Sequence, residues 1–213
     1  MAPVHETQDP LALYDRHGEG LARVRAEQAA LYERAGYANL QRYFPYRWAR
    51  TASRRLGMDW ERTRFMNPQL DDIEAELTYL RIREARPERV VEISPFRGWS
   101  TTWMLRALRD NGGGSLLSFD LIRDSERFVP AELSGNWTLL VGDVRDRLPD
   151  MPAEIDYLFL DSDHRAGFAQ WYLDELVPRM VPGAGGSIHD VFHGGRPSAE
   201  AKVVLEWLER ERI

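Results

Sequence analysis

The chain has 213 residues, of which 43% are hydrophobic and 29% are charged, and this balance predicts one globular domain with room for a small extension. It contains no cysteine, which excludes a disulfide framework, a thiolate zinc site and a cysteine nucleophile. The formal net charge of −6 argues against a nucleic-acid or membrane surface as partner, so we expect a small-molecule partner.

The N-terminal part of the sequence is predicted to be helical. It shows no signal-peptide pattern, and no run of about 18 apolar residues occurs anywhere in the sequence, so we expect a cytoplasmic protein without a transmembrane helix. From Pro10 to about Met66, apolar residues recur at helical spacing without strand-like alternation. Residues 1–68 are therefore predicted to form a helical N-terminal extension or lid.

Within this extension, residues 42–65 combine seven arginines with six aromatic side chains. Such a segment could form a lid over an anionic or sugar-like acceptor, because guanidinium groups and aromatic faces both suit these ligands. The interpretation that we favour is a solvated helix face that docks on the main domain or on a second subunit, which agrees with our expectation of a homo-oligomer.

Helical and strand-like patterns then alternate to the end of the chain. A helix is predicted from about Asn67 to Ile82, because apolar residues recur near the helical period before Pro87. Short β-rich runs follow, each ending in Gly, Asp or Ser, and helical segments separate most of them. The predicted strands are residues 90–94, 115–119, 137–141, 156–160 and 185–189.

Strands that are apolar on both faces and joined by crossovers specify a mostly parallel sheet covered by helices. We therefore predict an α/β fold with a Rossmann-like, doubly wound sheet. Such sheets bind ligands beyond the carboxyl ends of their strands, so the residues directly after each strand are the candidates for a site.

The first strand and its loop read VVEISPFRGWST, with Glu92 inside the strand. A buried carboxylate needs a partner, and we expect a cationic ligand or backbone donors of the loop; water or an arginine is the alternative. Only Gly98 remains of a dinucleotide-type glycine pattern, with Ser94 near an earlier glycine position. In the alternative interpretation the loop is only a tight turn, and Ser100 caps the next helix.

Acidic residues also follow the second and third strands. Asp120 ends the second strand, where a carboxylate can accept both hydroxyls of a ribose. Asp143 follows the third strand, where it could accept from an adenine amino group or stabilise an Asx-turn.

Two clusters follow the last two strands: LDSDH contains Asp161, Asp163 and His164, and HD contains His189 and Asp190. Strands one, four and five are neighbours in doubly wound sheets, so the clusters should face one another. Asp161, His189 and Asp190 form a candidate Mg²⁺ or Mn²⁺ site, and His164 is the candidate general base. In the alternative interpretation Asp163 and His164 only cap the next helix, and Asp190 is a loop acid.

In this order, the motifs VVEISPFRGWST, SFD, VGD, FLDSDH and SIHD resemble class I S-adenosylmethionine-dependent methyltransferases. More narrowly, they resemble the metal-dependent O-methyltransferases of natural-product pathways, including enzymes that act on macrolide sugars. The resemblance covers roughly residues 70–211, so residues 69–213 are expected to form the S-adenosylmethionine-binding domain. It implies methyl transfer to a hydroxyl of a sugar or another diol.

The resemblance also implies a role for each motif. The implied cofactor-binding residues, with Ser100 included from the first loop, are Glu92, Ser94, Gly98, Ser100, Asp120 and Asp143. The implied metal ligands are Asp161 and Asp190, together with His189 at a position where the sugar enzymes have a glutamate. Asp161 is also expected to take part in catalysis, and a histidine three residues after the acid of the fourth strand acts as the base, which matches His164.

The C-terminus departs from the family. The family fold ordinarily finishes with an antiparallel hairpin, whereas this sequence stops at Ile213 as its last predicted helix, residues 198–211, ends. We expect that a missing C-terminal segment, a truncated chain or a partner chain accounts for the open edge of the fifth strand.

Two other functions stay open. One is an accessory protein that binds the cofactor without turnover, and the other is an NAD-dependent oxidoreductase, which would need a fuller glycine pattern.

Overall fold

The computed structural model describes residues 9–35, 66, 68, 70–193 and 195–211. The arginine-rich stretch of residues 42–65 lies outside the described residues, so neither its predicted role as a lid nor its role as a docking face is addressed. Within the described part, no helix is long and apolar enough to cross a membrane.

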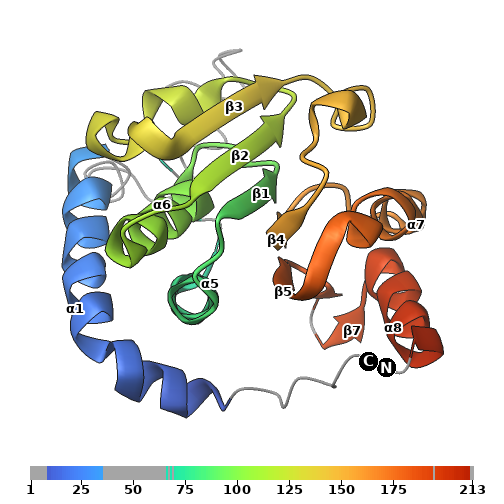
Figure 1. The fold of residues 1–213 in the computed structure, drawn as a ribbon, viewed down its shortest axis with the longest axis horizontal. Helices are drawn as coiled ribbons and strands as arrows, with labels where there is room; N and C mark the ends of the chain where they lie inside the picture. The colour runs from blue at the N-terminus through green and yellow to red at the C-terminus, as the bar shows by residue number, and fades with distance from the viewer. Residues whose placement is uncertain (1–8, 36–65, 67, 69, 194, 212–213) are drawn as a thin grey trace, which may run out of the picture.

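A five-stranded parallel sheet forms the centre of the molecule, with the strand order β3-β2-β1-β4-β5 (Figure 1). All five predicted runs form strands, and β1 lies between β2 and β4, so the strand order reverses beside it, as in other doubly wound sheets. The strands are β1 (Arg89–Ile93), β2 (Ser115–Asp120), β3 (Trp137–Val141), β4 (Ile155–Leu160) and β5 (Met180–Ile188).

Helices cover both faces of the sheet (Figure 1). One face carries α1, α5 and α6, which contact one another, and the other carries α7 and α8. The helices are α1 (Pro10–Ala35), α5 (Asp72–Ala85), α6 (Trp99–Asn111), α7 (Ala166–Glu175) and α8 (Ala199–Glu211).

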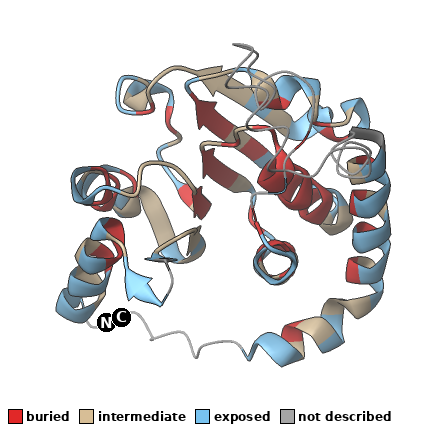
Figure 2. Cartoon of the chain, turned by 180° about the vertical axis from the view of Figure 1, so that it is seen from behind, coloured by how far each residue is buried: buried red, intermediate tan, exposed pale blue. Residues whose placement is uncertain are grey.

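Side chains that alternate along each strand divide the core into two clusters. In β4, Tyr157 and Phe159 pack with α1, α5 and α6, whereas Leu158 and Leu160 pack with α7 and α8. Figure 2 shows buried residues concentrated in the central strands and in α6. This three-layer α/β/α arrangement confirms the predicted fold class.

Several boundaries differ from the sequence prediction. Helix α5 begins after Asp71, whose side chain accepts from the backbone of Glu74 while Glu74 reaches back to Asp71, in a capping box. The chain between β2 and β3 forms two short 3₁₀ helices, η1 (Asp124–Arg127) and η2 (Ala131–Asn136). Strand β5 begins at Met180 rather than at Gly185.

Two further short 3₁₀ helices, η3 (Leu148–Asp150) and η4 (Val177–Arg179), precede β4 and β5. After β5, the two-residue strands β6 (Phe192–His193) and β7 (Arg196–Pro197) pair in a small antiparallel hairpin that is separate from the main sheet. In the part of the chain that the structure describes, β5 is one of the two edge strands of the sheet, and no strand follows α8. The expectation that further chain covers this edge stays a prediction.

Candidate functional site

The loop between β1 and α6 keeps the backbone shape of a glycine-rich turn with only one glycine. Ser94, Phe96 and Gly98 have φ angles of 71°, 48° and 81°, all in the left-handed region. This conformation costs a residue with a side chain roughly 1–2 kcal/mol, so the fold must hold it in place. The Ser94 N–H donates to the carbonyl of Phe119 at 2.7 Å, which provides part of that support. A search for glycines alone could not find this turn.

Gly98 is required by packing as well as by its φ angle. A Cβ atom at this position would lie 2.7 Å from a methyl carbon of Val129 and 3.5 Å from the Cβ of Ser125. Gly98 is also the N-cap of α6, and no side chain caps this helix. The alternative interpretation that Ser100 caps the helix is therefore wrong, because its hydroxyl donates to Glu92 at 2.6 Å instead.

Glu92 is fully buried, and its carboxylate accepts hydrogen bonds from three hydroxyl groups. Ser100 and Thr101 donate from α6, and Ser118 donates from the paired position on β2 at 2.6 Å. Burial raises the pKa of Glu92 to about 7, although the three hydroxyls oppose this shift. Hydroxyl groups therefore take the place of the expected backbone donors of the loop, and the expected contact with a cationic ligand stays a prediction. Glu92 instead joins β1, β2 and α6 beneath the turn.

Asp120 fastens the end of β2 to the same loop. One carboxylate oxygen accepts from the N–H of Phe96 at 2.7 Å, and the other accepts from the N–H of Ile122 at 3.2 Å. Burial raises the pKa of Asp120, while these backbone donors lower it. The side chain therefore lies at the end of β2, as predicted, beside the turn formed by residues 94–98.

Asp143 forms the Asx-turn of the alternative interpretation. Its Oδ1 accepts from the backbone N–H of Arg145 at 2.9 Å, and the Arg145 guanidinium pairs with the same carboxylate. This hydrogen-bonded guanidinium lowers the pKa of Asp143. Its expected contact with adenine stays a prediction.

The ends of β4 and β5 lie together, as expected. The His189 Nδ1 is 3.2 Å from Asp161 Oδ1 and 3.7 Å from Asp190 Oδ2, and its Nε2 is 2.9 Å from Glu74 Oε2. The hydrogen bond with Asp161 raises the pKa of His189 to about 9, and Glu74 and Asp190 add to this effect. Sequence reasoning missed Glu74. The pattern D-x-x-E that begins at Asp71 is typical of a capping box, and it could have shown that Glu74 lies in the first turn of a helix.

This donor set does not fit a divalent cation. Among the described residues, no group of three or more histidine, cysteine, aspartate or glutamate side chains is arranged to hold a metal ion. Both ring nitrogens of His189 face carboxylates, so the imidazole takes up donor positions that a cation would need. At the expected metal site, Asp161, His189 and Asp190 therefore form a cluster of carboxylates around an imidazole.

His164 is tied to α8 rather than to the start of α7. Its Nδ1 is 2.8 Å from Glu200 Oε2. Helix α7 has Arg165 as its N-cap without a side-chain cap bond, and Asp163 pairs with the Arg165 guanidinium at 2.8 Å. The alternative interpretation that Asp163 and His164 only cap this helix is thus wrong. Sequence reasoning missed Glu200, which shares the buried face of α8 with Val204, four residues later.

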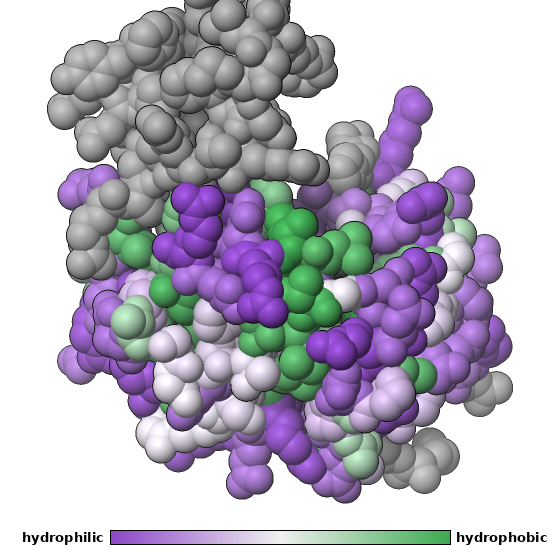
Figure 3. Space-filling view, turned by 90° about the horizontal axis from the view of Figure 1, so that it is seen from above, coloured by the Kyte–Doolittle hydropathy of each residue, from purple (hydrophilic) through white to green (hydrophobic). Residues whose placement is uncertain are grey.

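Apolar surface is available for a small molecule. Leu121, directly after β2, is 71% exposed, and Phe192, shortly after β5, is 53% exposed. In the space-filling view from above, a band of hydrophobic side chains crosses the middle of the face between hydrophilic ones (Figure 3).

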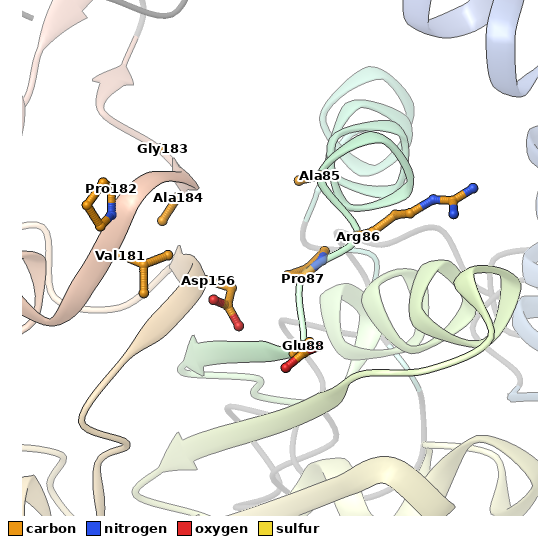
Figure 4. A pocket seen from close by; sticks show the side chains of 9 residues that line it. All are labelled: Ala85, Arg86, Pro87, Glu88, Asp156, Val181, Pro182, Gly183 and Ala184. Carbon is orange, nitrogen blue, oxygen red and sulfur yellow. The ribbon is translucent and has the colours of Figure 1, made fainter. Parts of the chain in front are cut away.

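A pocket lies at the other end of the strands, where β1 and β4 begin (Figure 4). Its lining includes Glu88, Asp156 and Pro182. Because the candidate residues follow the carboxyl ends of the strands, this pocket is separate from them.

Comparisons with known proteins agree with this arrangement. Residues 91–191 match the family model described as a methyltransferase domain. Cofactor-bound Rv0187 from MTB is 19% identical, with a TM-score of 0.57, and the match covers 81% of each chain. No curated protein has a sequence that matches this chain.

Two further solved structures are O-methyltransferases. TomG from Streptomyces achromogenes, involved in tomaymycin synthesis and solved with SAM, is 20% identical with a TM-score of 0.54, covering 84% of this chain and 85% of that one. An O-methyltransferase from Bacillus cereus, solved with SAH, is 17% identical with a TM-score of 0.55, covering 67% of this chain and 71% of that one. At these identities the likenesses show the fold.

Proposed function

We propose that this chain, which carries the methyltransferase domain and Rossmann-like fold of class I S-adenosylmethionine-dependent methyltransferases, transfers a methyl group to a hydroxyl of a small molecule. The observation that carries the proposal is the turn at residues 94–98, which lies inside the matched domain. It joins the end of β1 to the N-terminus of α6, whose free backbone N–H groups suit a polar or anionic part of a ligand.

The residues at the first three strand ends would hold the cofactor. The backbone around Ser94 and Gly98 would accept its methionine part, and Glu92 with Ser100 would act indirectly by keeping the turn in shape. Asp120 would bind the ribose hydroxyls, for which its position at the end of β2 is suitable, and Asp143 lies where adenine would be expected. The SAM and SAH bound to the two O-methyltransferases of similar fold support this assignment.

The chemistry needs alignment and one proton transfer. When bound, the cofactor supplies an activated methyl group, whose bond to sulfur breaks as its bond to the acceptor oxygen forms. His164 would take the proton of the acceptor hydroxyl, since an imidazole nitrogen can accept a proton and this side chain is 32% exposed. Asp161 would act through its hydrogen bond to His189 rather than through a metal ion.

The acceptor that we propose is a sugar or another diol of a natural product. TomG, which takes part in tomaymycin synthesis, supports natural-product biosynthesis as the setting. A metal-assisted reaction was expected from the resemblance, but the described donors do not fit a cation. Methyl transfer should therefore persist after treatment with a chelator.

The test is incubation of the protein with S-adenosylmethionine carrying a deuterated methyl group and a panel of sugars and diols, read by mass spectrometry. We expect a labelled methyl ether, and we expect His164→Gln to bind the cofactor in a calorimeter while losing the transfer. The absence of cofactor binding by the unmodified protein would overturn the proposal. Binding without transfer to any acceptor would favour the accessory protein, and binding of a nicotinamide cofactor instead would favour the oxidoreductase.

The same samples address the expected homo-oligomer. Light scattering during gel filtration measures the mass of the protein in solution, and a mass of about 25 kDa, that of one 24.7 kDa chain, would contradict it.

A further inference from the structure

A buried carboxylate lies against the candidate base. Glu200 is only 3% exposed, and it lies in the first turn of α8. Its two carboxylate oxygens have different partners: Oε2 is 2.8 Å from His164 Nδ1, and Oε1 accepts from the hydroxyl of Tyr172 at 3.0 Å. Burial of a carboxylate costs free energy unless the group is hydrogen-bonded, and these two contacts offset that cost.

The partners of Glu200 determine which imidazole nitrogen carries the proton. Burial raises the pKa of Tyr172 and Glu200 raises it further, so this hydroxyl stays protonated and donates. An ionised carboxylate only accepts, and therefore the His164 Nδ1 must donate to Glu200 as well. The neutral imidazole then carries its lone pair on Nε2.

The backbone also fixes this contact. The N–H of Glu200 donates to the carbonyl of His164 at 3.2 Å, so the two residues are joined through both main chain and side chain. Tyr172 lies on α7, which packs against α8, so the loop after β4 is held from two helices. The nearest charged neighbours along the chain, Asp163 and Arg165, pair with each other.

We propose that Glu200 is the positioning residue of His164, which holds the imidazole in the tautomer and orientation that removes the acceptor proton at Nε2. The inference rests on the proposed function. The proton of the acceptor hydroxyl moves to Nε2 as the bond between oxygen and methyl forms, and the imidazolium that results lies against the Glu200 carboxylate. Nothing is oxidised or reduced, and the proton later returns to water. Carboxylates support catalytic histidines in this way in other enzymes.

The experiment compares the unmodified protein with Glu200→Gln, which keeps the shape of the side chain and removes its charge. The negative charge of the Glu200 carboxylate stabilises the positive imidazolium, and Glu200→Gln removes that charge. The acidic limb of the pH profile of kcat should therefore move to lower pH. We also expect kcat to fall about tenfold to a hundredfold, with KM for S-adenosylmethionine unchanged within about twofold. Glu206→Gln, the same change at an exposed position of α8, is the matched control and should leave both quantities unchanged.

A spectroscopic measurement gives a readout that does not depend on turnover. In ¹⁵N-histidine-labelled protein, the His164 resonances, assigned by their loss in His164→Gln, should show protonated Nδ1 in the unmodified protein and a mixture of tautomers in Glu200→Gln. Glu200→Asp, which retracts the carboxylate but keeps its charge, should recover part of kcat.

The possible outcomes distinguish a failure of the role proposed for Glu200 from a failure of the proposed methyltransferase function. If the unmodified protein methylates an acceptor and Glu200→Gln has the same kcat, pH profile and tautomer, the inference alone is overturned. If the unmodified protein binds no cofactor, the proposed function fails and takes the inference with it. An equal loss of thermal stability and activity in Glu200→Gln, with an unchanged pH profile and tautomer, would reduce Glu200 to a structural residue.

Discussion

The two halves of the candidate site are held together by different forces. At the ends of β1 and β2, hydroxyls and backbone N–H groups within one strand, loop and helix unit surround the buried Glu92 and Asp120. At the ends of β4 and β5, imidazoles face carboxylates that come from distant helices, as in His189 with Glu74 and His164 with Glu200. The hydrogen-bond donors of the first half, the proposed cofactor half, are therefore local and uncharged. The second half, the proposed acceptor half, depends on protonation and on tertiary packing.

The largest expected effect breaks the first half. Glu92→Ala leaves the hydroxyls of Ser100, Thr101 and Ser118 without their acceptor in a buried site. Because each buried, unsatisfied polar group costs about 1–3 kcal/mol, we expect a loss of about 3 kcal/mol or more in the free energy of unfolding. Urea denaturation measures the loss of stability. Calorimetry measures cofactor binding, which we also expect to be lost.

Glu126→Ala, at an exposed glutamate of η1, is the control for this change and should stay within about 0.5 kcal/mol of the unmodified protein. An equally small effect of Glu92→Ala would show that the buried carboxylate does not hold the cofactor half together.

The ion pairs of the second half should make the free energy of unfolding depend on pH. The hydrogen bond with Asp161 raises the pKa of His189 in the folded protein to about 9 from its ordinary value of 6.5. The stabilising contribution of His189 is therefore complete below pH 6.5 and is lost as pH rises through 9. Integrated over this window, the contribution is at most about 3 kcal/mol. His189→Gln should remove this dependence, as measured by urea denaturation at pH 6 and at pH 9.5.

The two halves titrate in different windows, which sharpens the test. Burial raises the pKa of Glu92 in the folded protein to about 7 from its ordinary value of 4.5. Its contribution to stability is therefore lost as pH rises between these two values, below the main window of His189. Glu92→Gln should flatten the stability profile below pH 7 and leave the upper window in place. A profile above pH 7 that His189→Gln does not change would contradict the proposed difference between the halves.

Sequence patterns were sufficient for the local features of both halves. Apolar runs that end in Gly, Asp or Ser predicted all five strands of the sheet, and the order of the motifs brought Asp161 and His189 to neighbouring strand ends. These inferences succeed because strand periodicity and the right-handed crossover fix where a strand end lies. They required no knowledge of what a side chain touches.

The partners of these side chains could not be predicted in the same way. Glu74 is 115 residues from His189, and Glu200 is 36 residues from His164, so only tertiary packing brings each pair together. The left-handed backbone of the predicted tight turn could not be foreseen for another reason: Ser94 and Phe96 have a conformation that their residue types disfavour, and surrounding hydrogen bonds impose it. Contacts over long sequence separations and strained residues are where local propensity carries the least information.

A smaller effect separates crowding from backbone strain in the first half. Gly98→Ala combines a left-handed φ of 81° with a contact of 2.7 Å to Val129, whereas Gly112→Ala has a similar φ of 82° with nothing within 4 Å. We expect a loss of about 2–3 kcal/mol for the first and about 1 kcal/mol for the second. Thermal unfolding of both variants measures the difference, and equal losses would show that Val129 moves aside and that crowding is not what requires Gly98.

The smallest expected effect is a gain. Ser94 is held at a φ of 71°, and glycine adopts this conformation without the steric cost, so Ser94→Gly should relieve strain. Glycine also loses more backbone entropy on folding, and we therefore expect a net stabilisation of at most about 1 kcal/mol, with cofactor affinity retained. Ser134→Gly, in η2 where φ is not positive, should instead destabilise by about 0.5 kcal/mol. If Ser94→Gly destabilised the protein as much as Ser134→Gly does, the left-handed turn would not be under strain, and the cofactor half would owe its shape to the serine side chain rather than to the surrounding hydrogen bonds.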